Sequence, residues 1–165
     1  MATAKKMAKA GLVSGASGNV SQRVQDPERD LLAITVAGKD YNKFVLDDVV
    51  IIDFDGEAIE GDKLPSTETM THVAVYRART DVNAVIHTHS IYASALAVAG
   101  MNLPPIIDEL VVSLGGEIHV AEYGFPSSEE LGENVVAALG DRNAVLLRNH
   151  GVVGVGDSLE EALAV

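Results

Sequence analysis

The chain has 165 residues, of which 47% are hydrophobic, and its formal net charge at pH 7 is −12. This length and composition fit one domain with its own core, while the negative charge excludes surfaces that bind nucleic acid or anionic membranes. The absence of cysteine excludes disulfides, iron–sulfur clusters and thiolate zinc sites, so any metal must be held by His, Asp or Glu.

The predicted elements mix strands and helices along the whole chain. Apolar residues that recur about every 3.6 residues indicate helices, and apolar residues that recur every second residue indicate strands. Gly, Pro and Ser mark the ends of these elements. In chain order we expect a helix over 3–10, strands within 11–23 and 30–38, a hairpin over 49–62 with its turn at 55–56, a helix over 66–79, a strand over 83–90, a helix over 90–100, a strand over 115–123, a helix over 127–140, strands over 143–151 and 151–156, and a helix from 157. Because strands and helices do not alternate strictly, we expect a sheet covered by helices rather than a purely parallel sheet.

Serine and threonine residues precede three of these helices and are expected to cap them. The candidates are Ser66 or Thr67, Ser127 or Ser128, and Ser158, whose spacing from Glu161 is that of a capping box. The last helix has no terminator, so we expect a single domain over 1–165 that lacks a C-terminal tail. No apolar run has the length of a membrane span, and the N-terminal lysines precede no long apolar stretch, so we expect a cytoplasmic protein.

Three histidines lie at the ends of two apolar segments. The stretch "AVIHTHS" (84–90) places His87 and His89 two residues apart, and a strand directs residues at this spacing to one face. "AVLLRNHG" (144–151) ends its apolar run at His150. Two buried strands that end in histidines could bring three imidazoles together, and three histidines with an open fourth position are typical of a catalytic zinc site. The alternative is a set of hydrogen-bonded histidines at strand ends.

The other two histidines have less specific surroundings. His72 follows Glu68 by four residues on a predicted helix, so the two side chains share a face. We expect His72 to have a structural or supporting role. His119 lies in an alternating stretch and is expected to be a partly buried strand histidine.

The segment "KLPSTETMTH" (63–72) places hydroxyls and a carboxylate at a predicted helix start. Ser66 and Thr67 lie where unpaired N–H groups and the helix dipole favour an anion, and Glu68 lies in the first turn. Ordinary capping with a carboxylate at the positive end of the dipole is the alternative interpretation.

Two glycine turns precede this segment. "SGASGNVS" (14–21) contains Gly15 and Gly18 and could form an anion-binding nest to which Ser17 and Asn19 add donors, or simply a turn. "TVAGKDY" offers a second turn at Gly38.

Taken together, these stretches resemble the class II aldolase/adducin family, in particular its L-fuculose-phosphate aldolase type. The matching pieces occur in the family's order: "GLVSGASGNVS", "ITVAGKDY", "LPSTETMTH", "AVIHTHS" and "LLRNHG". The resemblance extends from about residue 10 to the end of the chain. It implies an α/β fold with three α-β-α layers around a central, largely antiparallel or mixed sheet.

The resemblance also implies roles for nine residues. The zinc ligands would be His87, His89 and His150, with one ion per subunit. Glu68 would be the catalytic carboxylate, which can also ligate the metal. The residues that hold the substrate phosphate would be Gly18, Asn19, Gly38, Ser66 and Thr67. Family members of this type are usually homotetramers with active sites at subunit boundaries, so we expect a homotetramer.

Two departures from the family pattern bear on the substrate. Ala37 stands where members usually have a threonine before the glycine of the second turn, which removes one hydroxyl donor. The segment "PPIIDELVV" (104–112) carries Asp108 and Glu109 and lacks the tyrosine that fuculose-phosphate aldolases use as a proton donor. The resemblance therefore supports a zinc lyase without identifying fuculose phosphate as the substrate.

The resulting hypothesis is a zinc-dependent aldehyde-lyase. It would cleave a small sugar phosphate or hydroxy-ketone by retro-aldol chemistry through a metal-bound enediolate, with Glu68 as general base and acid. Related epimerases tend to carry Asp at the position of Glu68, so Glu68 favours cleavage. The alternatives are a sugar-phosphate 4-epimerase, an isomerase, a dehydratase or a decarboxylase on the same zinc site, a structural zinc protein, and a non-catalytic adducin-like interaction module.

Overall fold

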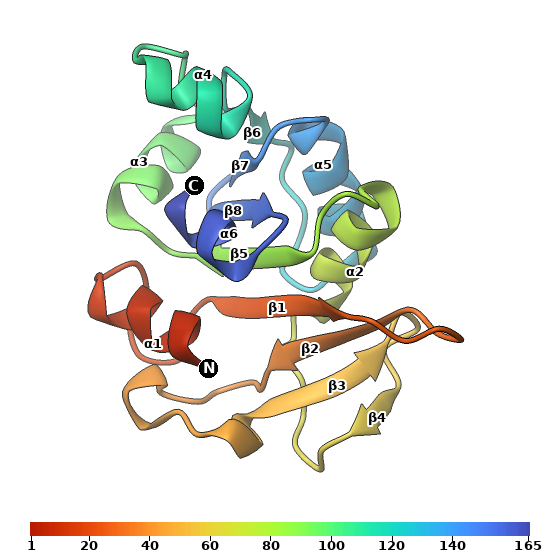
Figure 1. Cartoon of the computed structure of the whole chain (residues 1–165). Coiled ribbons are helices and arrows are strands. Elements are labelled where there is room, and N and C mark those ends of the chain that lie inside the picture. Colours follow the sequence, from red (N-terminus) through yellow and green to blue (C-terminus); the bar gives the residue numbers. More distant parts are fainter.

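The computed structural model, which describes residues 1–165, is built around one eight-stranded sheet (Figure 1). The strands are β1 (Asn19–Val24), β2 (Leu31–Thr35), β3 (Val49–Asp53), β4 (Ala58–Glu60), β5 (Ala84–Thr88), β6 (Val120–Ala121), β7 (Ala144–Leu147) and β8 (Gly151–Gly156). Their order in the sheet is β4-β3-β2-β1-β5-β8-β7-β6. Every neighbouring pair is antiparallel except β6 and β7, so the expected largely antiparallel, mixed sheet is confirmed.

Helices cover both faces of this sheet and complete the three expected layers. They are α1 (Ala2–Lys9), α2 (Thr69–Ala78), α3 (Ile91–Ala99), α4 (Asp108–Leu114), α5 (Glu129–Leu139) and α6 (Leu159–Ala164). In Figure 1, α2 and α5 lie together on one face and α1, α3 and α6 on the other. No helix has the length and apolar character that crossing a membrane requires.

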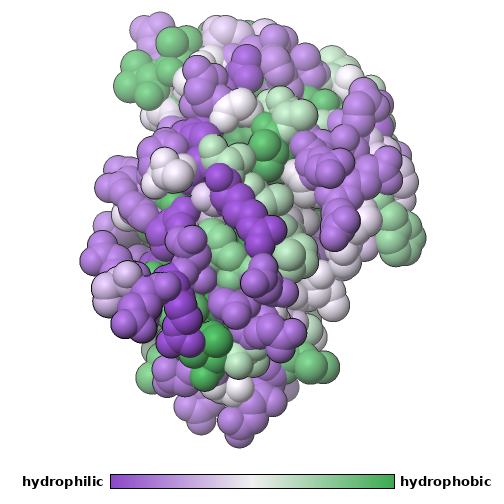
Figure 2. Space-filling view, turned by 90° about the vertical axis from the view of Figure 1, so that its right-hand side faces the viewer, coloured by the Kyte–Doolittle hydropathy of each residue, from purple (hydrophilic) through white to green (hydrophobic).

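Burial on both faces explains why the central strands have continuous apolar sequences. Every residue of β5 and of β7 is buried, because helices pack on each side of these strands. The α2–α5 layer packs closely at Gly132, where an added Cβ would lie 3.1 Å from the Ala74 Cβ. Figure 2 shows the outer surface of this layer, where hydrophilic side chains predominate.

The predicted helix ends are correct at several positions and wrong at one. The Ser128 hydroxyl accepts from the Leu131 N–H, and α5 stops at Gly140 as expected. Ser158 caps α6 by accepting from the Glu161 N–H, but the Glu161 carboxylate accepts from the N–H of Asp157, one residue before the capping-box position.

The prediction that Ser66 or Thr67 caps α2 is wrong, because the N-cap residue is Glu68 and it makes no side-chain cap bond. The reason is that the chain is still extended at Ser66, whose N–H donates to the Thr35 carbonyl at 3.0 Å beside the Val36–Pro65 bridge.

Two segments between α3 and α5 differ from the sequence prediction. The strand expected over 115–123 contains only the two residues of β6, because Ile118 pairs instead with Leu103 in an isolated bridge. Helix α4 was not predicted. It is short, and its exposed Val111 and Val112 disrupt the amphipathic pattern on which the prediction depends.

Candidate metal centre

The strand order brings the three histidines of the two apolar segments together. His87 belongs to β5, His89 follows that strand, and His150 lies in the turn between β7 and β8. Because β8 pairs with both β5 and β7, the β7–β8 turn lies beside the end of β5. One ring nitrogen from each histidine lies within 4.8 Å of the others, and the ring centroids are 4.7 to 5.0 Å apart.

Glycine at position 151 permits this close approach of the strands. A Cβ at Gly151 would lie 2.3 Å from the Thr88 carbonyl oxygen and 3.2 Å from Cε1 of His87. The turn before it is closed by the His150 N–H, which donates to the Leu147 carbonyl at 2.9 Å. Backbone packing, rather than side-chain flexibility, therefore sets the position of His150 relative to β5.

The hydrogen bonds of His87 fix its tautomer. Its Nδ1 donates to the Val152 carbonyl at 3.0 Å, so its Nε2 carries a lone pair and faces Nε2 of His89 at 3.0 Å. Burial, followed by the neighbouring His150 and His89 rings, lowers the pKa of His87 to about 3. Burial and then His150 also lower the pKa of His89. The neutral rings thus offer lone pairs to a cation. Nε2 of His89 donates to Nε2 of His87 in the metal-free chain, so ligation through this atom of His89 would require its hydrogen to be on Nδ1 instead.

Glu68 faces the same cluster from the start of α2. Its Oε2 lies 3.3 Å from Nε2 of His87 and its Oε1 lies 3.2 Å from Nε2 of His150. The Asn19 amide donates to Oε2 at 2.8 Å. Nδ1 of His150 is buried and has no partner within the chain. Three imidazole nitrogens beside one carboxylate form a donor set that suits a divalent cation such as zinc.

The other residues predicted at the site lie around this cluster. Gly18 has a φ of 73°, and a Cβ there would meet the His87 carbonyl oxygen at 2.6 Å. Asn19 pairs with His87 across β1 and β5. Ser66 is buried and its hydroxyl accepts from the Glu68 N–H at 3.3 Å, whereas Thr67 is exposed.

The Gly38 turn reaches the same region through the backbone. Gly38 has a φ of 68° and is exposed, and the preceding Ala37 donates its N–H to the Leu64 carbonyl at 3.0 Å. The turn therefore lies beside the segment that leads into α2. Lys39 follows Gly38 and pairs with the buried Asp48 at 3.3 Å, so its charge is partly neutralised.

The two remaining histidines are not part of the cluster formed by His87, His89 and His150. His119 is half-buried just before β6 and contacts Glu117 at 3.2 Å. His72 is fully buried and joins Asn19 to Ser21 and Tyr76, two residues that the sequence prediction missed. A usable signal was present, because Ser21 shares a strand face with Asn19 and Tyr76 follows His72 by one helical turn.

Comparisons with known proteins agree with this geometry. The sequence model described as "Class II Aldolase and Adducin N-terminal domain" matches residues 1–165. The chain is 38% identical to 5-deoxy-D-ribulose 1-phosphate aldolase of Bacillus thuringiensis serovar kurstaki over 165 residues, which cover all of this chain and 76% of that protein. It is also 38% identical to L-fuculose phosphate aldolase of Escherichia coli K12 over 161 residues, which cover 98% of this chain and 73% of that protein.

Solved structures show the same fold. A structure of L-fuculose 1-phosphate aldolase superposes with a TM-score of 0.90 at 36% identity, over 98% of this chain and 74% of that chain.

Proposed function

This chain belongs to the class II aldolase and adducin family, and on that basis we propose that it is a zinc-dependent aldehyde-lyase that cleaves a small sugar phosphate by a retro-aldol reaction. The observation that carries the proposal is the convergence of three imidazoles with the Glu68 carboxylate in contact with two of them. The substrate class is supported by the relatives, whose names specify ketose phosphates.

The zinc ion would be held by His87, His89 and His150, and Glu68 could add a fourth ligand when no substrate is present. When bound, such an ion supplies the Lewis acidity that stabilises negative charge on a substrate oxygen while a carbon–carbon bond breaks. The Nδ1–H bond from His87 to the Val152 carbonyl keeps Nε2 of this ring available as a ligand.

Glu68 would be the proton carrier of the reaction. In the cleavage direction, its carboxylate takes the proton of the hydroxyl on the carbon that becomes the aldehyde. The bond from that carbon to its neighbour then breaks, and its electron pair moves into the ketone fragment. Glu68 returns the proton to the carbon of this fragment, so no external acid or base is consumed.

The substrate phosphate would bind at the entry to α2. Ser66 and Thr67 precede this ten-residue helix, whose first N–H groups and dipole favour an anion. The turns at Gly18 and Gly38 would add backbone N–H donors. Because Lys39 is held by Asp48, phosphate binding would depend mainly on N–H and hydroxyl groups.

We also propose that the chain acts as a homotetramer. Large apolar side chains are exposed on α3, on α4 and between them, which supports burial of this region in an assembly. They are Ile91, Tyr92, Val98, Met101, Ile106, Ile107, Val111 and Val112. Analytical ultracentrifugation tests this part, and a monomer at micromolar concentration would contradict it.

Product analysis of zinc-loaded protein tests the lyase assignment. Incubation with 5-deoxyribulose 1-phosphate or L-fuculose 1-phosphate should release dihydroxyacetone phosphate and an aldehyde in equal amounts. Glu68→Gln should retain zinc but lose turnover, whereas His89→Ala should lose zinc in elemental analysis. An epimerised sugar phosphate without cleavage, or unchanged turnover in Glu68→Gln, would contradict the mechanism.

A further inference from the structure

A chain of buried hydrogen bonds connects Glu68 to the far side of α2. The side-chain NH₂ of Asn19 donates to the Glu68 carboxylate at 2.8 Å, and the side-chain oxygen of Asn19 contacts Nε2 of His72. Nδ1 of His72 lies 2.6 Å from the Ser21 hydroxyl, which lies 2.8 Å from the Tyr76 hydroxyl. His72 has no exposed surface, and Asn19, Ser21 and Tyr76 are each at most 3% exposed.

The chemistry of these groups allows one direction of donation. An ionised Glu68 can only accept, so Asn19 must present its NH₂ to Glu68 and its carbonyl oxygen to His72. Nε2 of His72 must then carry the proton, and Nδ1 must accept from Ser21. The Ser21 oxygen in turn accepts from Tyr76. Rotating the Asn19 amide would place two oxygens against each other, so the assignment of its amide follows from the network.

Burial supports this assignment. It lowers the pKa of His72 to about 3, with a smaller contribution from His87 in the same direction, so the ring is neutral and has one N–H. Burial also raises the pKa of Tyr76, which therefore keeps its hydroxyl proton. Every proton that the network requires is present at neutral pH.

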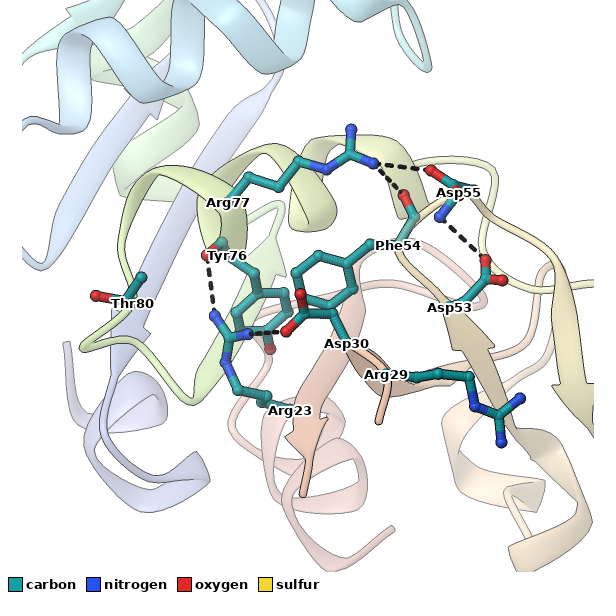
Figure 3. A pocket seen from close by; sticks show the side chains of 9 residues that line it. All are labelled: Arg23, Arg29, Asp30, Asp53, Phe54, Asp55, Tyr76, Arg77 and Thr80. Carbon is teal, nitrogen blue, oxygen red and sulfur yellow. Dashed lines mark hydrogen bonds and ion pairs between the residues drawn. The ribbon is translucent and has the colours of Figure 1, made fainter. Parts of the chain in front are cut away.

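The far end of the network is closed to solvent by a cationic and aromatic cluster. The Tyr76 ring stacks on Phe54 with centroids 6.0 Å apart, and the Arg23 guanidinium lies 5.1 Å from the Tyr76 ring centroid. Figure 3 shows Arg23 donating to the Tyr76 carbonyl and to Asp30 at the wall of a surface pocket. The network is thus anchored at both ends, and its four members beyond Glu68 have almost no surface exposed to solvent.

We propose that His72 is a positioning residue of the reaction, which fixes the Asn19 amide so that its NH₂ holds the Glu68 carboxylate against His87 and His150. This inference rests on the proposed role of Glu68 as proton carrier. The Asn19 amide donates to the same Glu68 oxygen that lies 3.3 Å from Nε2 of His87, so His72 controls through Asn19 where the carboxylate lies. A purely structural histidine would affect only stability.

Two substitutions separate these roles. His72→Leu keeps the apolar volume but removes the donor, and His72→Gln can restore an N–H toward Asn19 and an acceptor toward Ser21. In zinc-loaded protein, His72→Leu should lower kcat about 10- to 100-fold with little change in KM. His72→Gln should recover most of the lost kcat. A folded, zinc-loaded His72→Leu protein with unchanged kcat would overturn the proposal.

Nitrogen-15 NMR of the His72 ring gives a test that depends neither on activity nor on a variant that folds. In zinc-loaded parent protein at pH 7, the ring should be the neutral Nε2–H tautomer. Tyr76→Phe should leave this tautomer unchanged, because it removes only the last hydroxyl. An Nδ1–H tautomer or an imidazolium in the parent protein would overturn the network. If the expected tautomer is found but no sugar phosphate is cleaved, the proposed function fails and the network stands.

Discussion

Gly151→Ala should damage the candidate metal site selectively. Gly151 begins β8, which lies between β5 and β7, and these two strands lead to the three histidines. The added methyl group would lie 2.3 Å from the Thr88 carbonyl oxygen and 3.1 Å from Cδ2 of His89. Ordinary carbon–oxygen contacts are about 3.3 Å or longer, so β5 and the start of β8 would have to separate by roughly 1 Å. A shift of this size exceeds the tolerance of about 0.5 Å for a ligand set.

The expected cost has two parts. The added methyl group would be forced against the backbone, which should lower the free energy of unfolding by about 1–3 kcal/mol, the usual cost of adding a methyl group to a well-packed core. Displacement of the ligands should weaken zinc binding by about 10- to 100-fold, the range seen when groups that orient metal ligands are changed. Urea denaturation measures the first quantity, and competition for zinc with a chromogenic chelator measures the second.

Gly156→Ala is the matched control because it lies at the other end of β8. Its Cβ would also meet backbone, 2.9 Å from the Ala162 nitrogen, but it is remote from the histidines. It should lower stability and leave zinc affinity unchanged. If both variants change zinc affinity equally, or if Gly151→Ala leaves it unchanged, then strand spacing does not set the ligand geometry.

Three further predictions follow from charge and donor placement. Because the pKa of His72 is about 3 instead of 6.5, the unfolded chain binds a proton that the native chain does not between these pH values. His87 is shifted in the same way, so in metal-free protein each of these two histidines should lower the free energy of unfolding by up to ~1.4 kcal/mol per unit as the pH decreases across that window, in denaturant titrations. A hydrogen bond from Lys63 and then the Val45 N–H lower the pKa of Asp48 to about 2, so the stabilisation is complete above pH 3.8 and is lost as pH falls toward 2. Asp48→Asn should destabilise the protein at pH 7, and the difference from the parent should shrink between pH 4 and pH 2. Ala37→Thr should lower KM for phosphorylated ketoses but not for free ones. An equal effect on both would show that the side chain at position 37 does not act on the substrate phosphate.

Local sequence patterns were sufficient to predict elements whose signals are contained within a few residues. Gly100 ends α3 in the left-handed conformation with a φ of 66°, and the Asp55–Gly56 turn joins β3 to β4 as expected. His87 at the end of β5 and His89 just after it could likewise be assigned to one face. In each case the determining physical interaction connects neighbours in the chain.

Tertiary pairing decided the features that the sequence prediction missed. Ser66 does not cap α2 because it hydrogen-bonds to Thr35, more than thirty residues earlier in the chain. The network through His72 depends on β1 lying beside α2, and Ser21 alone gives no indication of that arrangement. The direction of hydrogen donation follows only when the partners of both ring nitrogens are known.

The position of the site in the sheet explains why its parts are so distant in sequence. The three clustered histidines belong to the half of the sheet formed by β5, β8, β7 and β6, whereas Asn19 lies on β1, in the half formed by β4, β3, β2 and β1. The two halves meet where Asn19 pairs with His87, and α2 enters at the same point with Glu68. The pairing of β1 with β5 therefore places Asn19, the donor to the proposed proton carrier, beside the proposed metal ligands, although these groups come from opposite halves of the sheet.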